Sequence, residues 1–183
     1  MNAGWSADGW LLRARRVDSP NFGPRPPGVE VSLIVIHNIS LPPGQFGGRW
    51  VEDFFCNRLD ASAHPYFAEI AALQVSAHFF LRRDGELLQF VSADARAWHA
   101  GESAWRGRPN CNDYSIGIEL EGSDDQPFAT AQYAGLWPLL DTLRNRYPID
   151  GVVGHSDIAP GRKTDPGLHF DWAGLRCRSG LSD

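Results

Sequence analysis

The chain has 183 residues, of which 43% are hydrophobic, and a formal net charge of −5. This length suits one domain with a full hydrophobic core, so we expect a single domain over residues 1–183. Lys and Arg form no cluster, which argues against nucleic-acid binding. No apolar run approaches the roughly 20 residues of a membrane span, and the first residues lack the apolar core of a secretory signal. We therefore expect a monomeric, cytoplasmic protein without membrane partners.

The cysteine and lysine contents are both informative. Cys56, Cys111 and Cys177 are odd in number and form no CxxC pair. A disulfide framework or thiolate zinc site is therefore not expected, and plain thiols are. Lys163 is the only lysine among 17 basic residues. Lysine is a compact ammonium whose pKa can be tuned, so this position either needs an ammonium or kept its lysine by chance.

The first half of the chain predicts one buried strand and two short helices. Residues 18–30 are rich in Pro and Gly and predict a surface loop. Residues 31–36 are almost continuously apolar and β-branched, which is typical of a strand buried on both faces. Short helices are predicted over residues 50–55 and from Pro65, a residue that suits a first helical turn. The face of the second helix would carry Phe67, Ile70 and Leu73.

A hairpin and an alternating strand follow. Two apolar runs flank residues 82–85, and the Asp-Gly pair there is a strong hairpin signal. Residues 101–113 predict another loop. Residues 115–121 alternate, which predicts a strand with one face in the core and one face carrying carboxylates. The core face would hold Ile116, Ile118 and Leu120, and the other Ser115, Gly117, Glu119 and Glu121.

The longest predicted helix covers residues 130–147, with Thr130 as N-cap and a kink at Pro138. Its buried stripe would contain Tyr133, Leu136, Trp137, Leu140 and Leu143. A short strand over residues 151–155 and a last helix over residues 172–177 complete the chain. Interleaved strands and helices with one tight hairpin predict a mixed α/β fold, with a central mixed β-sheet flanked by helices.

Two predicted strands end in histidine, at His37 and His155, and Asp165 follows ten residues after the second. Functional groups of α/β proteins gather where strands end. Two imidazoles and one carboxylate suit a catalytic zinc ion that keeps one position for water. The spacing is not diagnostic, because a histidine at a strand end is often only hydrogen-bonded, so the pattern leaves both interpretations open.

Three charged residues have two interpretations each. Glu119 and Glu121 lie in an otherwise apolar strand, where a buried carboxylate is costly unless it is paired. Each either pairs with an Arg or acts as a general base beside a metal. Lys163 lies two residues before Asp165. It either stabilises an oxyanion that develops there or is an exposed loop lysine.

The remaining histidines are weaker candidates. His99 follows Trp98 in a segment of mixed apolar and polar character, which is typical of a binding wall. We place Trp98 against a ligand and leave His99 between a ligand contact and a structural role. For His64, His78 and His169 a structural role is favoured, although His78 could line the cleft.

Six segments together carry a resemblance to a known family: VIHNISLPPGQFGG, HPYFAEI, SAHFFLRRDG, AWHAG, CNDYSIGIELEG and GHSDIAPGRKTDPG. They resemble AmpD-type N-acetylmuramoyl-L-alanine amidases, which are relatives of phage endolysin amidases and animal peptidoglycan recognition proteins. The match runs from about Gly9 to Trp172. The IELEG segment and the last of the six are its most specific parts.

The resemblance implies a role for each candidate residue. It implies that His37, His155 and Asp165 hold one Zn²⁺ per chain, with Glu119 as catalytic base and Lys163 as the stabilising cation. The expected substrate contacts are Asn38, Trp98, His99 and Arg108. Arg106 and Arg108 could meet the carboxylates of the stem peptide. Some relatives carry an Arg directly before the Cys where this chain has Asn110, so the resemblance itself does not carry this contact over.

The implied reaction is zinc-dependent hydrolysis of the amide bond between N-acetylmuramic acid, in its 1,6-anhydro form, and L-alanine. The resemblance implies that this occurs on small muropeptides during cytoplasmic cell-wall recycling. It also implies that, in bacteria with an inducible β-lactamase, loss of the amidase lets these fragments accumulate and induces that gene. The alternatives are a non-catalytic muropeptide-binding module and a zinc peptidase acting within the stem peptide.

Overall fold

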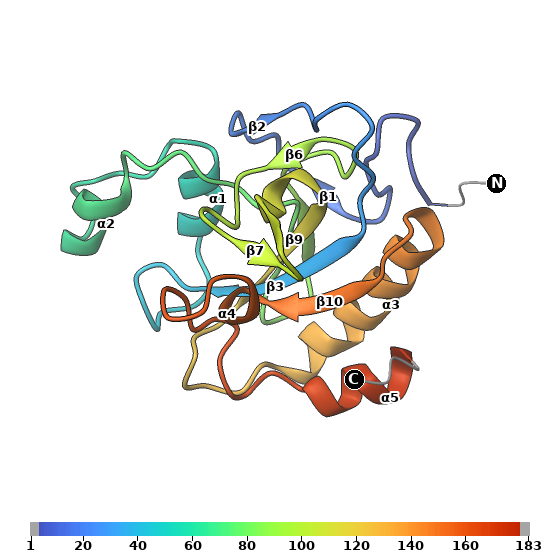
Figure 1. Ribbon diagram of the computed structural model, residues 1–183. Coiled ribbons are helices and arrows are strands. Elements are labelled where there is room, and N and C mark those ends of the chain that lie inside the picture. The colour runs from blue at the N-terminus through green and yellow to red at the C-terminus, as the bar shows by residue number, and fades with distance from the viewer. Residues whose placement is uncertain (1–3, 180–183) are drawn as a thin grey trace.

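The computed structural model describes residues 4–179, so the predicted domain 1–183 includes short ends outside the described residues. Its centre is a six-stranded sheet (Figure 1). From one edge to the other, the strands are β1 (Arg15–Arg16), β5 (Leu87–Gln89), β4 (Phe79–Leu81), β9 (Ser115–Glu121), β3 (Leu33–Ile39) and β10 (Gly151–Gly154). Only β4 and β5 pair antiparallel in this sheet. The prediction of a mixed sheet is therefore confirmed.

Short elements and helices surround this sheet. Two small antiparallel ladders pair β2 (Phe22–Gly23) with β6 (Arg96–Ala97) and β7 (Ala104–Trp105) with β8 (Arg108–Pro109). The helices are α1 (Trp50–Phe55), α2 (Pro65–Ile70), the 3₁₀ helix η1 (Cys111–Asp113), α3 (Thr130–Arg146), α4 (His155–Ile158) and α5 (Trp172–Ser179). Among these described helices, none is long and apolar enough to cross a bilayer.

One face of the sheet packs against the long helix α3, with α5 beside it (Figure 1). The even-numbered residues of β3 and β9 supply this core, because successive side chains of a strand point to opposite faces. The sheet contributes Ile34, Ile36, Ile116, Ile118 and Leu120, and the helix contributes Leu136, Leu139, Leu140 and Leu143. Burial of these aliphatic side chains, at about 25 cal/mol per Å² of apolar surface, fixes α3 on the sheet.

The opposite face is covered in two parts. Helix α1 packs Val51, Phe54 and Phe55 against Phe80 and Leu88 of the hairpin strands. On the other half, Leu33 and Val35 of β3 pack with Cys111, Tyr114 and Ile158. All seven residues of β9 are buried. Ile116, Ile118 and Leu120 lie in the core shared with α3, and the other face carries Glu119 and Glu121, as predicted. Helices on both sides of the sheet leave neither face of this central strand open to solvent.

Most predicted elements are confirmed at or near their predicted limits, and three local predictions are wrong. Residues 18–30 and 101–113 are not plain loops, because they contain β2 and the β7–β8 hairpin with η1. The N-cap of α3 is Ala129 and not Thr130. The side-chain oxygen of Gln132 accepts a hydrogen bond from the backbone N–H of Ala129 at 2.9 Å. The cap is thus provided by the side chain of Gln132, in the first turn of the helix, and not by the side chain of the N-cap residue.

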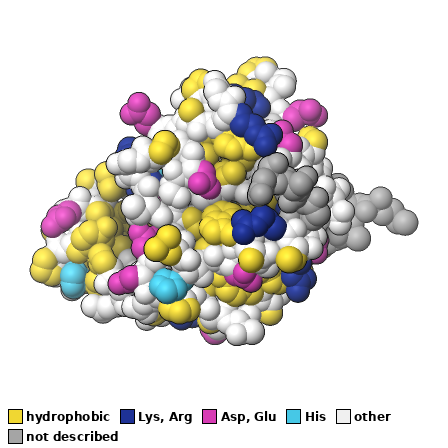
Figure 2. Space-filling view, turned by 60° about the horizontal axis from the view of Figure 1, so that its bottom comes forward, with side chains coloured by type: hydrophobic (Ala, Val, Ile, Leu, Met, Phe, Trp, Pro, Cys, Tyr) yellow, Lys and Arg dark blue, Asp and Glu magenta, His cyan; other side chains and the backbone are white. Residues whose placement is uncertain are grey.

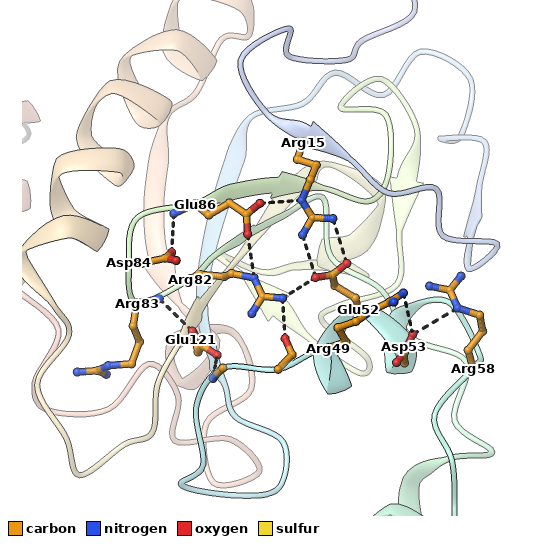
Figure 3. A network of polar contacts seen from close by, with 12 residues as sticks. Arg15, Arg49, Glu52, Asp53, Arg58, Arg82, Arg83, Asp84, Glu86 and Glu121 are labelled. Atoms are coloured by element: carbon orange, nitrogen blue, oxygen red, sulfur yellow. Dashed lines mark hydrogen bonds and ion pairs between the residues drawn. The ribbon is translucent and has the colours of Figure 1, made fainter.

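A charged network ties the start of the chain to α1 and the hairpin (Figure 3). Glu52 of α1 is buried. The Arg15 guanidinium donates hydrogen bonds to both carboxylate oxygens of Glu52, at 2.9 and 3.1 Å. Arg82 donates to the same carboxylate at 2.5 Å and meets Glu86 at 3.1 Å. Bidentate guanidinium–carboxylate pairs fix geometry as well as charge. This network therefore holds α1 at the edge of the sheet, beside the loop that leads from β3.

Candidate functional site

A cavity of about 620 Å³ opens near the carboxyl ends of β3 and β9. Its lining includes all but one of the predicted site residues: His37, Asn38, Trp98, His99, Glu119, His155, Lys163 and Asp165. Tyr66, Ile70 and Leu73 add an apolar wall on the α2 side. Hydrophobic side chains gather at the left end of the molecule, where α2 lies (Figures 1 and 2). The cavity thus has one apolar wall and one polar, charged floor.

Strand register brings the first two functional side chains together. His37 lies opposite Glu119 in the parallel ladder of β3 and β9, so both side chains leave the same face of the sheet. That face is the one turned away from α3, as the alternation with Ile36 and Ile118 requires. His155 follows the neighbouring strand β10 directly, as the first residue of α4. β3 continues to Ile39, beyond the predicted end at His37, and His155 lies in α4 directly after β10 instead of ending the strand. That chemistry gathers here stays a prediction.

His37, His155 and Asp165 form one compact cluster of possible metal ligands. The two Nδ1 atoms lie 3.0 Å apart, and Asp165 Oδ2 lies 3.0 Å from His37 Nδ1 and 3.1 Å from His155 Nδ1. Asp165 lies on the loop that follows α4. This loop is held against the helix, because the backbone N–H of Ser156 in α4 donates to the carbonyl of Asp165. Three ligand atoms from three separate segments therefore converge on one point.

The protonation of this cluster fits a cation at that point. His155 Nε2 lies 3.1 Å from the carbonyl of Ala100, a group that only accepts, so the ring proton sits on Nε2 and Nδ1 carries a lone pair. Burial lowers the pKa of His37 to about 4, which keeps that ring neutral. Lone pairs that face one another without a proton repel, and a divalent cation relieves this repulsion. The residues present therefore fit a His₂Asp zinc site.

The two glutamates of β9 differ sharply. Glu121 accepts backbone N–H groups of Gly47 and Arg83, at 2.5 and 3.0 Å. Glu119 is 8% exposed, and its Oε2 atom is buried without a hydrogen-bond partner in the described part of the chain. Burial raises the pKa of Glu119 well above its usual value, the charge of Asp165 adds to this, and that of Lys163 opposes it. Glu121 is thus structural, and Glu119 is the carboxylate free for chemistry.

Lys163 and Asn38 lie at the polar side of the cavity. The Lys163 side chain is exposed at the rim, and its backbone N–H bonds to the carbonyl of Ala159 at 3.1 Å. Asn38 donates to Asp124 Oδ1 at 2.7 Å, and the hydroxyl of Thr164 donates to Asp124 Oδ2. Asp124 therefore joins the residue after His37 to the residue before Asp165. Sequence reasoning missed it because nothing in its local pattern points to this link.

The predicted substrate contacts are only partly brought together. Trp98 and His99 line the cavity, whereas Arg108 does not. The Arg108 guanidinium lies over the ring of Tyr114, 3.7 Å from its centroid. Arg162 lines the cavity instead, and it donates to the carbonyl of Ala100 at 2.8 Å. Sequence reasoning did not single out Arg162, although it directly precedes the lone lysine.

His78, which could have lined the cleft, lies in the interior. It is fully buried just before β4, and its Nδ1 accepts the backbone N–H of Gly117 at 3.0 Å. Its Nε2 lies 3.1 Å from the carbonyl of Ala95. His64 is the N-cap of α2 and accepts from Tyr66 N–H at 3.1 Å. The structural roles predicted for these two histidines are therefore confirmed.

The family model for N-acetylmuramoyl-L-alanine amidases matches residues 27–168, which include every residue of the cluster described above. The chain belongs to the N-acetylmuramoyl-L-alanine amidase family. A curated amidase relative, the 1,6-anhydro-N-acetylmuramyl-L-alanine amidase AmpD of Citrobacter freundii, is 55% identical over 171 residues. That match covers 92% of this chain and 91% of the relative. The chain is therefore an enzyme, an N-acetylmuramoyl-L-alanine amidase.

Solved structures of amidases have the same fold as this chain. A crystal structure of a selenomethionine derivative of AmpD has a TM-score of 0.91 and 55% identity, covering 93% of this chain and 96% of that one. The amidase AmiD of E. coli, solved with the substrate anhydro-N-acetylmuramic acid-L-Ala-D-γ-Glu-L-Lys, has a TM-score of 0.61 and 32% identity. It covers 98% of this chain and 66% of that one. The amidase fold is thus shared from the sheet to the surrounding helices.

Proposed function

We propose that this amidase hydrolyses the bond between 1,6-anhydro-N-acetylmuramic acid and L-alanine in small muropeptides, during cytoplasmic recycling of the cell wall. The supporting observation is the pairing, on neighbouring strands, of a His₂Asp cluster with the buried and unpartnered carboxylate of Glu119. The bond itself is proposed from the AmpD relative, whose name states this substrate and which aligns over most of both chains.

In this proposal His37, His155 and Asp165 hold one zinc ion. When bound, zinc in such a site acts as a Lewis acid that polarises a carbonyl and lowers the pKa of a water toward about 7. His37 and His155 are both at least 96% buried, at 1% and 4% exposure. The two rings therefore cannot swing away, and they keep their nitrogen atoms aimed into the cavity.

Glu119 moves the proton. Its carboxylate accepts a proton from the attacking water and returns it to the nitrogen of L-alanine, which leaves as an amine. A carboxyl group whose pKa is raised by burial suits both halves of this task. Its carboxylate is a stronger base than an ordinary one, and its protonated form persists nearer neutral pH, where it can protonate the leaving amine. Glu119 lines the cavity, and no described residue bonds to its buried Oε2 atom, so this carboxyl group is not committed to a structural contact there.

Lys163 and the cavity walls act on the substrate. The ammonium of Lys163, at the rim above Asp165, stabilises the oxyanion that develops on the lactyl carbonyl oxygen. Asn38 presents its amide to the substrate while Asp124 holds it in place, and Trp98 offers an apolar face. Both ring nitrogens of His99 are used inside the protein, and Arg108 lies outside the cavity lining. We therefore do not carry these two into the proposed substrate contacts.

The test is the mass of the products from purified anhydromuramyl-tripeptide, incubated with enzyme with and without a zinc chelator. Anhydro sugar and intact tripeptide, formed only without chelator, are the expected result. Cleavage within the tripeptide would mean a zinc peptidase. Unchanged substrate in both samples would favour a muropeptide-binding module, and full cleavage with chelator would overturn the zinc requirement.

The cytoplasmic location has its own support and its own test. Cys56, Cys111 and Cys177 are all free thiols, which fits a reducing compartment. Cell fractionation with activity assays should place the amidase in the cytoplasmic fraction, and activity confined to a periplasmic or medium fraction would overturn this. In a host with an inducible β-lactamase, deletion should also raise expression of that enzyme.

A further inference from the structure

The second ring nitrogen of His37 is held inside the protein by a chain of hydrogen bonds. His37 Nε2 lies 2.9 Å from His99 Nδ1, and His99 Nε2 lies 3.1 Å from the hydroxyl oxygen of Ser115. That hydroxyl lies 2.6 Å from the backbone carbonyl of Cys111. The chain therefore runs from a candidate zinc ligand to a carbonyl oxygen, which accepts hydrogen bonds and never donates them.

This carbonyl determines where each proton sits. A hydroxyl has one proton, and Ser115 gives it to Cys111. Ser115 can then only accept from His99, which places the His99 proton on Nε2. The neutral His99 ring has one N–H, so its Nδ1 is bare and accepts from His37 Nε2–H. A neutral His37 with its proton on Nε2 turns a bare Nδ1 toward the ligand cluster.

The residue after His99 binds the second ring nitrogen of the other histidine ligand, His155. The carbonyl of Ala100 accepts from His155 Nε2 at 3.1 Å. Asn112 Oδ1 accepts the backbone N–H groups of His99 and Ala100, at 3.0 and 2.8 Å. A two-residue segment, fixed by one amide oxygen, therefore supplies the outer hydrogen-bond partner of both histidines.

The sheet leaves a space for the His99 ring. Gly117 lies in the middle of β9 between the side chains of Ser115 and Glu119, and a Cβ there would lie 2.4 Å from His99 Cγ. Glycine inside a strand weakens the strand and often marks a close approach of another group. The His99 ring thus packs directly on the backbone of Gly117. This contact keeps the two ring nitrogens of His99 within hydrogen-bond distance of Ser115 and His37.

We propose that His99 is a positioning residue that, together with Ser115, keeps the proton of His37 on Nε2 and so leaves His37 Nδ1 bare for the metal. This inference rests on the proposed zinc-dependent function. It gives His99 a role through His37 instead of a contact with the substrate. Outer partners of histidine ligands fix the tautomer and ring orientation, and their loss typically weakens metal affinity 10- to 100-fold.

Zinc affinity tests the proposal with matched variants. In a competition with a chromophoric chelator, Ser115→Ala and His99→Leu are each expected to weaken zinc binding by about 10- to 100-fold. His99→Asn keeps an acceptor oxygen near the position of Nδ1 and should recover most of the loss. Ser19→Ala removes another buried hydroxyl, which donates to the carbonyl of Phe55 and bonds to none of the histidines in this chain of hydrogen bonds, and should bind zinc as the wild type does.

The tautomers can also be read directly, without metal or substrate. In ¹⁵N-labelled zinc-free enzyme, long-range ¹H–¹⁵N spectra should place the ring protons of His37 and His99 on Nε2, and Ser115→Ala should shift His99 partly to the Nδ1–H form. This readout stays valid even if the enzyme proves independent of zinc, so failure of the proposed function and failure of this inference are distinguishable. A wild-type His99 proton on Nδ1 overturns the inference, as does a folded His99→Asn variant with the zinc affinity of His99→Leu.

Discussion

Glu119 and Glu121 are two positions apart in one buried strand, on the same face, and yet carry different tasks. Glu121 accepts two backbone N–H groups and so fixes the loop that ends at Gly47 to the turn at Arg83. Glu119 has a carboxylate oxygen without a partner in the described structure. A buried group without partners costs stability, which fits the proton-carrying role proposed for Glu119.

We expect the Gln variants of these two residues to separate activity from stability. Glu119→Gln should keep zinc and a thermal midpoint at or above the wild-type value, while kcat falls by about 10²- to 10⁴-fold. Glu121→Gln should lower the free energy of unfolding by about 1–3 kcal/mol, because its amide NH₂ faces a backbone donor. Kinetics with denaturant unfolding on both variants measures this. An active Glu119→Gln enzyme would remove Glu119 from its proposed role.

His78 predicts a pH dependence of stability. Burial lowers the pKa of His78 to about 3, and Arg25 beside it acts in the same direction. Its Nδ1 accepts from Gly117 and cannot do so once protonated. An unfolded histidine has a pKa of about 6.5. Below this pH, His78 is protonated in the unfolded chain but stays neutral in the folded protein. Stability is fully present above pH 6.5 and falls as the pH drops toward the folded pKa.

The expected slope from His78 approaches about 1.4 kcal/mol per pH unit below pH 6. Urea unfolding of zinc-free wild type and His78→Asn at pH 7.0, 6.0 and 5.5 isolates this slope, because the other histidines contribute equally to both proteins. The Asn oxygen retains an acceptor for Gly117 without a titrating ring. Equal pH slopes for the two proteins would contradict the assignment.

At the scale of elements, the hairpin between β4 and β5 packs against the start of α3. Gly85 in its turn has φ of +91°, and a Cβ there would lie 3.0 Å from the carbonyl oxygen of Ala131. Gly85→Ala should therefore lower the free energy of unfolding by at least about 1–2 kcal/mol, the usual cost of a left-handed backbone alone. Gly23→Ala, where a Cβ meets nothing within 4 Å, is the control in denaturant unfolding. A neutral Gly85→Ala would mean that the hairpin moves freely against α3.

The elements also show what sequence can predict. Periodicity and turn residues identified β3, the hairpin and α3, because burial against one layer leaves a local pattern. The β7–β8 hairpin and η1 were missed, since their residues are held by distant partners such as Arg25, which donates to the carbonyls of Asn112 and Asp113. The histidine candidates His37 and His155 followed from strand ends. The difference between the two glutamates and the role of Asp124 depend on contacts across the fold, which no local pattern records.

At the scale of the whole molecule, the ligand cluster joins segments that are far apart in the chain. His37 comes from β3, His155 from the start of α4, and Asp165 from the loop that follows. An ion held by all three binds the folded state and hardly the unfolded one, so free zinc at 100 times its dissociation constant should add about 2.7 kcal/mol. For a chain of this size the thermal midpoint should rise by about 5–10 °C.

Calorimetric scans of zinc-free enzyme with increasing free zinc test this coupling. Asp165→Ala removes one ligand, and its midpoint should stay nearly constant over the same zinc range. An equal rise in this variant and the wild type would place the stabilising ion elsewhere. Magnesium is a matched control, because two imidazoles suit zinc and not a hard cation that prefers oxygen ligands.

Lys163 is the only lysine side chain of the protein, and it is exposed at the rim of the cavity. Among the side chains of these 183 residues, a reagent directed at primary amines therefore has one target. Amine coupling to a biosensor chip would fasten many molecules with the cavity against the matrix, and their measured affinity for muropeptides would be too low. The same chemistry is an advantage for a covalent inhibitor, since an aldehyde or activated ester carried by a substrate analogue would meet one amine side chain at the cavity rim. In the proposed mechanism that amine stands beside the scissile bond.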